Sequence, residues 1–494
     1  MTSSTKHVQT IPANIAFGLI VFSGISFFIF WSVLTNTRYV LGDEAWGAAA
    51  VLGNIWEVAV FTIRWDLHPP LYYMALDLWA VISKSDLWLR LFSGTLHTLS
   101  AAFTYLWIAK RYSSKTAAIC ACLVFFNIIL LEYSMSIRMY SWVCLLSLIV
   151  YFKTSTYRTK PSKANLVWIF TLELMLVYSH AIGLAFVFFH FVFGLIGLWQ
   201  LNNRLLSRQI VTWAVSHVFI ALLSLPVLAN SMIKSAGHAY EPSLFDAFSL
   251  LNSLFISHYL IFGLLLSAVL LFGIIKKQFI VEMVCYLLLP IITFFLISIF
   301  VKPMWLSRNF VFALPILSIC LGVIISQLRI HKLMPIVILV PFMVLNALSL
   351  NKIYNDYPNQ AFENVISIVN TKLAALKKDQ QLCVVSTAPL GQYWTLNRYL
   401  NGNEWGNPMF HQPPLNHTWQ AVSDKLPQFA KTLLYIHSDE ENVVLAENMI
   451  ISSHRHPICD TLNEGQVLYV GKPDWEKRSI KLLSDNKFAA IYVL

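Results

Sequence analysis

The chain has 494 residues, of which 57% are hydrophobic, 14% aromatic and only 12% charged, against about 25% charged in a typical soluble domain. This composition and a mean hydropathy of +0.62 exclude an ordinary soluble enzyme. The formal net charge of +10 suits either a nucleic-acid-binding protein or basic loops beside membrane spans, so the positions of the lysines and arginines decide between these classes.

Apolar segments fill most of the first 350 residues. A membrane helix needs roughly 20 mostly apolar residues, and about eleven segments between residues 14 and 350 meet this requirement. The first, residues 14–34, is too long for the apolar part of a cleavable signal peptide and has no clear small-residue cleavage site. The sequence therefore predicts a mainly α-helical, polytopic membrane protein with about eleven transmembrane helices.

Short basic links set the predicted orientation. Lysine and arginine gather near residues 110–115, 153–163, 201–209, 276–277 and 329–332. The positive-inside rule places these links in the cytoplasm, with the N-terminus inside and everything after about residue 351 outside. The alternation holds if the apolar stretch 69–83 lies at the outer interface and does not cross. Since membrane topology then explains the basic residues, we expect no nucleic-acid partner.

The first outer segment, residues 35–87, carries two adjacent carboxylates, Asp43 and Glu44, directly after the first span. Desolvation near a membrane surface raises the pKa of a carboxyl group and suits it to act as a base. Asp66, His68 and two prolines follow further along the segment. The alternative interpretation is a surface connector whose tryptophans and tyrosines form an interfacial belt.

Basic residues recur at the predicted outer ends of later spans. Arg138 begins an otherwise apolar helix, and Lys302 and Arg308 lie between the ninth and tenth spans. A guanidinium at this depth is costly unless it binds an anion or extends to the lipid headgroups, and its planar donors match phosphate oxygens. His180, at the outer end of the fifth span, is either a packed histidine or a substrate contact. Acids and cations on one face are what a reaction with a phosphorylated lipid requires.

Ordered segments of the chain resemble a known family. They are GDEAWGAAA (42–50), HPPLYY (68–73), RLFSGTLHTLSAAFTYLWIAKRY (90–112), SMSIRMYSW (134–142), YSHAIG (178–183) and SRNFVFALP (307–315). Together they resemble the GT-C class of polytopic glycosyltransferases, specifically the dolichyl-phosphate-mannose protein mannosyltransferases and the bacterial aminoarabinose transferase. The chain departs from the latter at His68, where lysine is common, and lacks the luminal repeat domain of the eukaryotic enzymes, which favours a bacterial type and leaves the acceptor open.

The resemblance implies inverting transfer of a hexose or pentose from a polyprenyl-phosphate donor, outside the cytoplasm. It implies that Asp43, with Glu44 beside it, activates the acceptor, and that Arg138 and Arg308, joined by Lys302, hold the donor phosphate. The expected sugar or phosphate contacts are His68, Tyr72, Tyr73, Tyr140 and His180. The expected partners are the lipid-linked sugar, membrane lipids and a protein, glycolipid or polysaccharide acceptor. No cofactor is assigned, and a divalent-metal requirement stays open.

The last segment, residues 351–494, changes character. Strand-like runs at 382–387, 432–438, 466–472 and 488–494 alternate with polar or helix-like segments. This pattern predicts a small α/β domain, which the topology places in the periplasm beside a catalytic membrane domain of residues 1–350 in the bacterial inner membrane. An oxidising compartment would permit a disulfide between Cys383 and Cys459.

Two other functions are alternatives for this sequence: transport, and polymerisation or ligation of lipid-linked sugars. A transporter would place ionisable residues along a path through the bilayer, where Glu173 and Glu282 are the best candidates, although Glu173 is expected to be paired within the bundle. A lipid-linked-sugar polymerase or ligase would carry its basic residues in a large central outer loop. Here the corresponding loop, residues 232–252, is short and contains only Lys234 and His238 as basic or near-basic groups.

Overall fold

A computed structural model of the chain describes residues 12–34, 40, 43–51, 53–66, 68–202, 207–233, 280–301, 307–327 and 334–355, and six short strands after residue 381. The chain divides into two compact units. The helical unit comprises Met1–Leu34 and Gly53–Asn355, and the sheet unit comprises Thr35–Leu52 and Asp356–Leu494.

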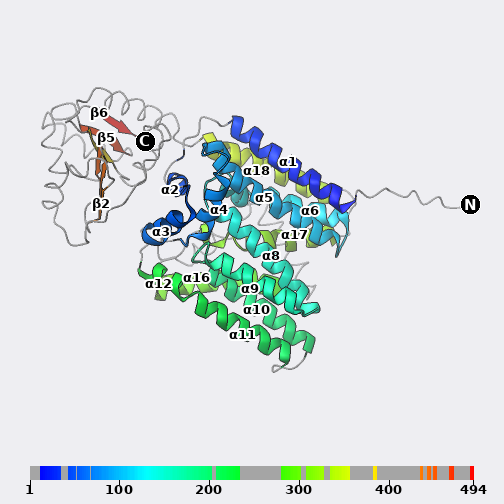
Figure 1. Cartoon of the computed structure of the whole chain (residues 1–494). Helices are drawn as coiled ribbons and strands as arrows, with labels where there is room; N and C mark the ends of the chain where they lie inside the picture. The colour runs from blue at the N-terminus through cyan, green and yellow to red at the C-terminus, as the bar shows by residue number, and fades with distance from the viewer. Residues whose placement is uncertain are drawn as a thin grey trace, which may run out of the picture. The chain divides into compact units, whose positions relative to one another are not determined.

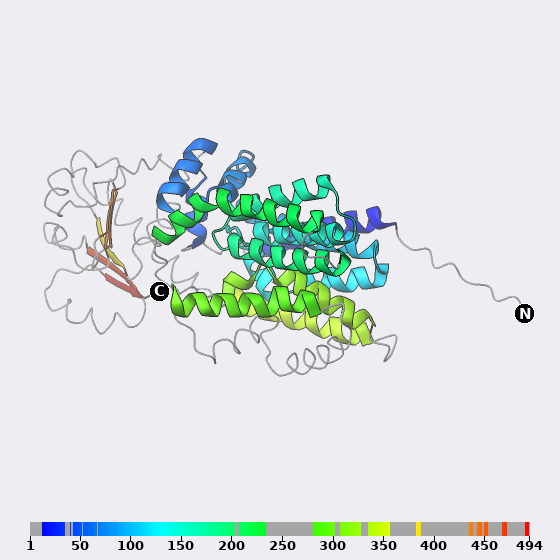
Figure 2. The same ribbon diagram turned by 90° about the horizontal axis from the view of Figure 1, so that it is seen from below.

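The helical unit is a bundle built around α5 (Figure 1). Its elements are α1 (Ala13–Leu34), α3 (Ile55–Trp65), α4 (Leu71–Trp79), α5 (Asp86–Ala109), α6 (Ser114–Phe125), α7 (Ile128–Ser134), α8 (Tyr140–Thr159), α9 (Lys163–Val177), α10 (Gly183–Asn202), α11 (Arg208–Leu223), α12 (Leu225–Ile233), α15 (Ile280–Met283), the π-helix η2 (Val284–Leu288), α16 (Leu289–Phe300), the 3-10 helix η3 (Ser307–Phe310), α17 (Leu314–Gln327) and α18 (Met334–Asn355). Helix α5 packs against α1, α6 and α8, while α9, α10 and α11 lie side by side (Figures 1 and 2).

The outward faces of several helices are apolar and their inward faces carry the polar residues. On α11 the exposed residues include Val211, Val215, Val218 and Leu222, at helical spacing. The buried face of the same helix carries Trp213 and His217. Helix α16 repeats the arrangement, with Ile292, Leu296 and Ile299 exposed and Ser298 buried. Broad apolar surfaces of this kind are typical of lipid contact.

Among the described residues, Gly183–Leu201 is the one helix whose length and hydropathy alone suit a membrane span. The pair α6 and α7, bent by 61° at a short break, adds a second such span if the two count together. Helices α5 and α8 are long enough, but they do not meet the same hydropathy criterion. The mainly helical architecture is thus confirmed, while the count of about eleven spans stays a prediction.

Side chains of the bundle complete the backbone hydrogen bonds at the break between α6 and α7. At the end of α6, the carbonyl of Phe125 accepts a hydrogen bond from His97 Nε2 at 2.9 Å. The carbonyl of Phe126 accepts one from Asn346 Nδ2 on α18 at 2.7 Å. Asn127 then begins α7 by accepting from the backbone N–H of Leu130 at 3.2 Å. Irregular backbone is tolerated inside a membrane protein when protein groups complete its hydrogen bonds in this way.

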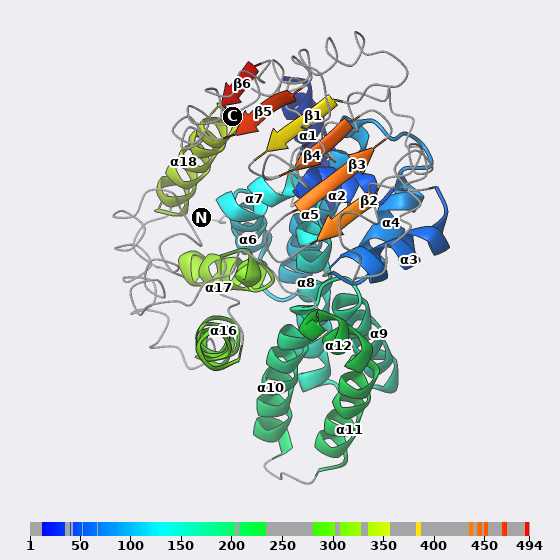
Figure 3. The ribbon, with the colours of Figure 1, turned by 90° about the vertical axis from the view of Figure 1, so that its left-hand side faces the viewer.

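The sheet unit contains one six-stranded sheet, whose order β2-β3-β4-β1-β5-β6 is visible in Figure 3. The strands are β1 (Leu382–Ser386), β2 (Leu434–His437), β3 (Asn442–Ala446), β4 (Met449–Ser452), β5 (Val467–Gly471) and β6 (Ala490–Val493). Strand β1 is parallel to both β4 and β5, β6 is parallel to β5, and β2, β3 and β4 run antiparallel.

Each of the four strand-like runs found in the sequence contains a strand, whereas β3 and β4 were not predicted. The helix-like segments of the predicted α/β domain and Cys459 lie outside the described residues, so the α/β class and the disulfide stay predictions. The unit also contains the seven-residue helix α2 (Asp43–Ala49).

Close packing of α10 against α11 makes Gly194 a sensitive position. A methyl group on Gly194 would overlap the ring of Trp213, whereas Gly18 on α1 has nothing within 4 Å of the equivalent point. The Trp213 ring is fully buried and its Nε1 donates to the carbonyl of Phe191 at 3.0 Å, so it cannot move aside easily.

We expect Gly194→Ala to lower the free energy of unfolding by about 1–3 kcal/mol through overpacking. The matched variant Gly18→Ala should be neutral or stabilising by about 1 kcal/mol, because alanine is the better helix former. Thermal unfolding of both purified variants in the same detergent checks this. Equal midpoints for the two variants would contradict the close packing of α10 and α11.

Candidate functional site

The predicted site residues are distributed over both units. In the helical unit, His68 precedes α4, Tyr72 and Tyr73 lie on α4, Arg138 and Tyr140 lie at the start of α8, His180 lies in the turn between α9 and α10, and Arg308 lies in η3. Asp43 and Glu44 form the first turn of α2 in the sheet unit. Lys302 lies outside the described residues.

A buried hydrogen-bonded chain links an acid to a guanidinium. The hydroxyl of Tyr73 donates to Asp66 Oδ2 at 2.5 Å, and Arg138 Nη1 donates to the same hydroxyl oxygen at 3.1 Å. All three side chains are buried. Burial raises the pKa of Tyr73 well above its usual value, and the charge of Asp66 adds to the effect against the opposing charge of Arg138. Tyr73 therefore keeps its proton and joins Asp66 to Arg138.

His180 packs among aromatic rings close to this chain. Its ring centroid is 4.4 Å from that of His68, 5.5 Å from Phe312 and 6.2 Å from Tyr140. Burial lowers the pKa of His180 well below its usual value, and the positive charges of His68, Arg138 and Arg308 lower it further. His180 is therefore neutral near pH 7, and the fixed positive charge of the site comes from the arginines.

The hydrogen bonding of His180 also defines which ring nitrogen carries the proton. Nδ1 is 3.1 Å from the backbone N–H of Ile182, which can only donate. In a neutral imidazole the other nitrogen then carries the hydrogen. His180 Nε2 is consequently a hydrogen-bond donor within the electrostatic reach of Arg138 and Arg308.

The turn at residues 178–182 holds the helices of the site together. The carbonyl of Tyr178 accepts from the backbone N–H of Leu71 at 3.0 Å, which fixes the start of α4 just after Pro70. Ser179 Oγ accepts from Trp142 Nε1 on α8 at 2.8 Å. Proline suits this position because a helix start needs no hydrogen bond from its N–H. The sequence YSHAIG therefore positions two helices as well as His180.

A pair of tryptophans locks the far end of α4 to α5. Trp79 Nε1 donates to the carbonyl of Trp88 at 2.8 Å, and Trp88 Nε1 donates to the carbonyl of Trp79 at 2.9 Å. Their rings stack at 4.7 Å with an interplanar angle of 12°. Tyr72 packs in the core near this pair, its ring 5.9 Å from that of Phe92. The structure thus brings Tyr73, Arg138, His68 and His180 together and surrounds Tyr72 with aromatic rings.

Sequence reasoning did not single out Asp66 as a site residue. Asp66 ends α3, accepts the backbone N–H of His68 at 3.0 Å through Oδ1, and holds Tyr73 through Oδ2. The sequence feature that could have indicated Asp66 is its position two residues before His68, which the two prolines follow. Asp43 and Glu44 are the more prominent acids of this segment in the sequence, because they are adjacent and follow the first span directly.

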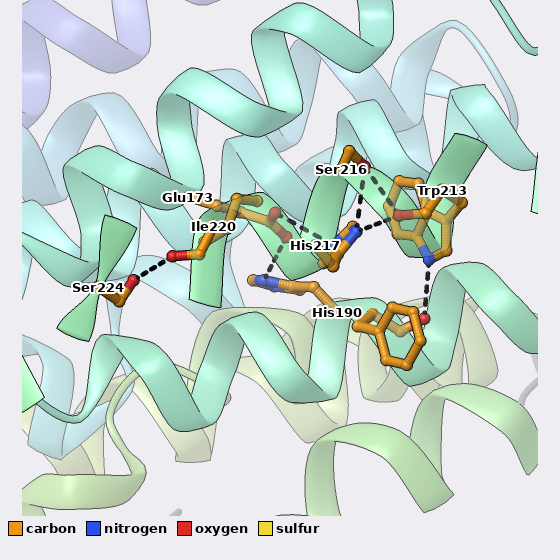
Figure 4. A network of polar contacts seen from close by, with 8 residues as sticks. Glu173, His190, Trp213, Ser216, His217, Ile220 and Ser224 are labelled. Carbon is orange, nitrogen blue, oxygen red and sulfur yellow. Dashed lines mark hydrogen bonds and ion pairs between the residues drawn. The ribbon is translucent and has the colours of Figure 1, made fainter. Parts of the chain in front are cut away.

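The two glutamates that favoured a transporter are both paired in the structure. Glu173 Oε2 is 3.2 Å from His217 Nε2, and Glu173 Oε1 is 3.8 Å from His190 Nδ1 (Figure 4). His217 Nδ1 donates to the carbonyl of Trp213 at 2.8 Å, so its Nε2 faces the glutamate. Glu282 Oε1 is 4.0 Å from Arg158 Nη1. The predicted pairing of Glu173 within the bundle is confirmed.

No protein-family model matches this chain, and no curated protein matches it. The fold nevertheless resembles that of a polytopic glycosyltransferase of the GT-C class whose structure is known.

Solved structures of one particular protein, ArnT from Cupriavidus metallidurans, share this fold. The apo structure has a TM-score of 0.55 and 10% sequence identity, covering 87% of this chain and 94% of that chain. The structure of ArnT bound to undecaprenyl phosphate has the same TM-score and identity, covering 89% and 98%. ArnT is an aminoarabinose transferase. The resemblance to this class that the sequence predicts is confirmed at the level of the fold.

The pairing of Glu173 predicts a structural role for it. Glu173→Ala removes one member of a buried pair and should lower the free energy of unfolding by about 3–5 kcal/mol. Glu173→Gln should lower it less, because an amide still contacts His217. Thermal unfolding checks both variants, with Glu57→Ala, an exposed glutamate on α3, as the control that changes little. A Glu173→Ala variant as stable as the wild type would contradict the structural role and would favour the transport interpretation.

Proposed function

We propose that the chain transfers a sugar, hexose or pentose, from a polyprenyl-phosphate donor to an acceptor on the outer side of a membrane. The observation that carries the proposal is the buried chain from Asp66 through Tyr73 to Arg138, with His180 within reach of the charge of Arg308. The fold supports it, because ArnT, which shares that fold, has been solved with undecaprenyl phosphate bound.

Two guanidinium groups suit a lipid phosphate. When the bond between the sugar and the phosphate breaks, negative charge grows on the leaving phosphate, so fixed cations stabilise the transition state more than the ground state. Arg138 is buried, where Coulomb interactions are stronger than in water. Asp66 and Tyr73 act as positioning residues, since they orient Arg138 through the hydroxyl of Tyr73.

His180 and its aromatic neighbours suit the sugar. The Nε2 of a neutral His180 donates a hydrogen bond without adding charge, which matches a sugar hydroxyl or a phosphate oxygen. Tyr140 and His68 flank the His180 ring. These aromatic faces, together with Tyr73, form the donor contacts of the proposal.

Acceptor activation is assigned to Asp43 in the first turn of α2. Its side chain is exposed, whereas that of Glu44 is buried, so Asp43 is the carboxylate that an external acceptor can approach. The acceptor oxygen attacks the anomeric carbon as the polyprenyl phosphate departs with the electrons of the broken bond, and Asp43 takes the acceptor proton. One direct displacement inverts the anomeric configuration.

Helix α3 supports a location at the membrane surface. Trp56, Val60 and Ile63 recur at helical spacing and are 74%, 62% and 55% exposed. Such an amphipathic helix with an exposed tryptophan lies in the membrane interface. The HPPLYY segment follows α3 directly, which keeps the proposed donor site next to the lipid.

The decisive experiment incubates the purified protein with a panel of polyprenyl-phosphate sugars and with protein, glycolipid and polysaccharide acceptors. We expect release of polyprenyl phosphate from one donor and an inverted anomeric bond in the product. If no donor is hydrolysed or used, the enzymatic proposal fails and transport becomes the better explanation.

Asp43→Asn should abolish sugar transfer, because the amide cannot accept the acceptor proton. Glu44→Gln is the matched variant and should retain transfer, because the buried neighbour has no part in the proton step. Product formation in membranes, normalised to protein abundance by immunoblotting, measures both. Retained transfer by Asp43→Asn would remove Asp43 from the role of base.

Arg138→Gln and Arg308→Gln should each lower the rate constant of transfer by roughly 10²–10³, the usual cost of removing one preorganised donor. Tyr73→Phe keeps both cations and should cost less. Single-turnover kinetics with saturating donor separates this effect from weaker donor binding. Unchanged rates in the arginine variants would assign those residues to headgroup anchoring.

A further inference from the structure

A polar cavity lies at the other end of α8 from the candidate site. Helix α8 runs from Tyr140 to Thr159, and eighteen residues separate Tyr140 from Arg158, which corresponds to about 27 Å of helix. The cavity has a volume of about 450 Å³. Its polar lining includes Arg111, Tyr112, Ser155, Arg158, Gln200 and Glu282. We call it the inner cavity, because the predicted topology places this end in the cytoplasm.

Arg158 is built into the wall of the inner cavity. Its guanidinium lies 4.1 Å from the centre of the Phe193 ring and 4.0 Å from Glu282 Oε1. Its side chain crosses Gly197 on α10, where a methyl group would overlap Arg158 Nε. The side chain is 17% exposed. The absence of a side chain at Gly197 therefore leaves room for Arg158, which lines the cavity.

Arg111 supplies a second cation in the lining of the inner cavity. Its guanidinium stacks 3.9 Å from the centre of the Trp107 ring and donates to Thr156 Oγ1 at 2.9 Å. These contacts come from α5 and α8, so Arg111 is held between two helices. Stacking on an aromatic face leaves the edge of a guanidinium available for planar anion recognition.

The charges of the lining residues indicate the charge of the ligand that the inner cavity would bind. Arg111 and Arg158 contribute two positive charges and Glu282 one negative charge, so an ionised lining carries a net charge of +1. Basic pockets between membrane helices on the cytoplasmic side bind lipid headgroups, and cavities of about 300–1,000 Å³ hold groups of headgroup size. We propose that the inner cavity binds a phosphodiester headgroup with a single negative charge, distinct from the proposed sugar donor site.

The test uses the whole purified protein in phosphatidylcholine nanodiscs that contain a minor fraction of phosphatidylglycerol. A parallel arm adds glycerophosphoglycerol, the same headgroup without acyl chains, to nanodiscs of phosphatidylcholine alone. Native mass spectrometry of the protein released from the discs counts retained ligand, and a titration gives Kd. Binding in the first arm alone identifies a membrane lipid as the source, and binding in both arms identifies the headgroup itself as sufficient.

We expect Arg158→Gln combined with Glu282→Gln, which removes both charges of the pair, to weaken phosphatidylglycerol binding roughly tenfold or more, as for the loss of one charge-assisted hydrogen bond. Glu282→Gln alone should tighten it, because the lining gains positive charge. The control is Arg208→Gln, an exposed cation at the start of α11 that does not line the cavity.

Two results would overturn the proposal. One is that the wild-type protein binds neither phosphatidylglycerol nor glycerophosphoglycerol. The other is that the double variant binds like the Arg208→Gln control while Glu282→Gln shows no gain, since a purely structural ion pair predicts that pattern. Neither result bears on sugar transfer, which is measured separately.

Discussion

Polar groups inside the helical unit depend on protein partners, because its outward faces are apolar. A buried carbonyl, carboxylate or guanidinium without a partner would cost several kcal/mol. This constraint explains why His97 and Asn346 converge on the break between α6 and α7, and why Glu173 is enclosed by histidines. A charged side chain inside the bundle is therefore expected either to be paired with a protein group or to bind a ligand.

The charged groups fall into arrangements with different consequences. Glu173 meets two histidines in a closed contact between α9, α10 and α11, and such a contact ties the helices together (Figure 4). Arg138 donates to the phenol of Tyr73, which donates to Asp66, and the charge of Arg138 acts on His180 together with that of Arg308.

Much of this arrangement follows from the sequence and some does not. Arg138 stood out because a guanidinium is costly in so apolar a segment, and the family resemblance added Tyr73 and His180. Arg138 does contact Tyr73, and its charge acts on His180. Asp66 was missed because its contact with Tyr73 crosses the end of one helix and the start of another, where helical spacing has no meaning. Strand β3 was not predicted because only the polar residues 438–441 separate it from β2, so the two strands form one run in the sequence.

The reciprocal hydrogen bonds of Trp79 and Trp88 have a mechanical consequence. Each indole donates to the backbone of the other helix, so α4 cannot slide along or rotate against α5 without breaking both bonds and the ring stack. The two helices therefore move as one rigid body that includes Tyr73. A rearrangement of the bundle at this point would therefore have to carry α4 and α5 together or break both hydrogen bonds.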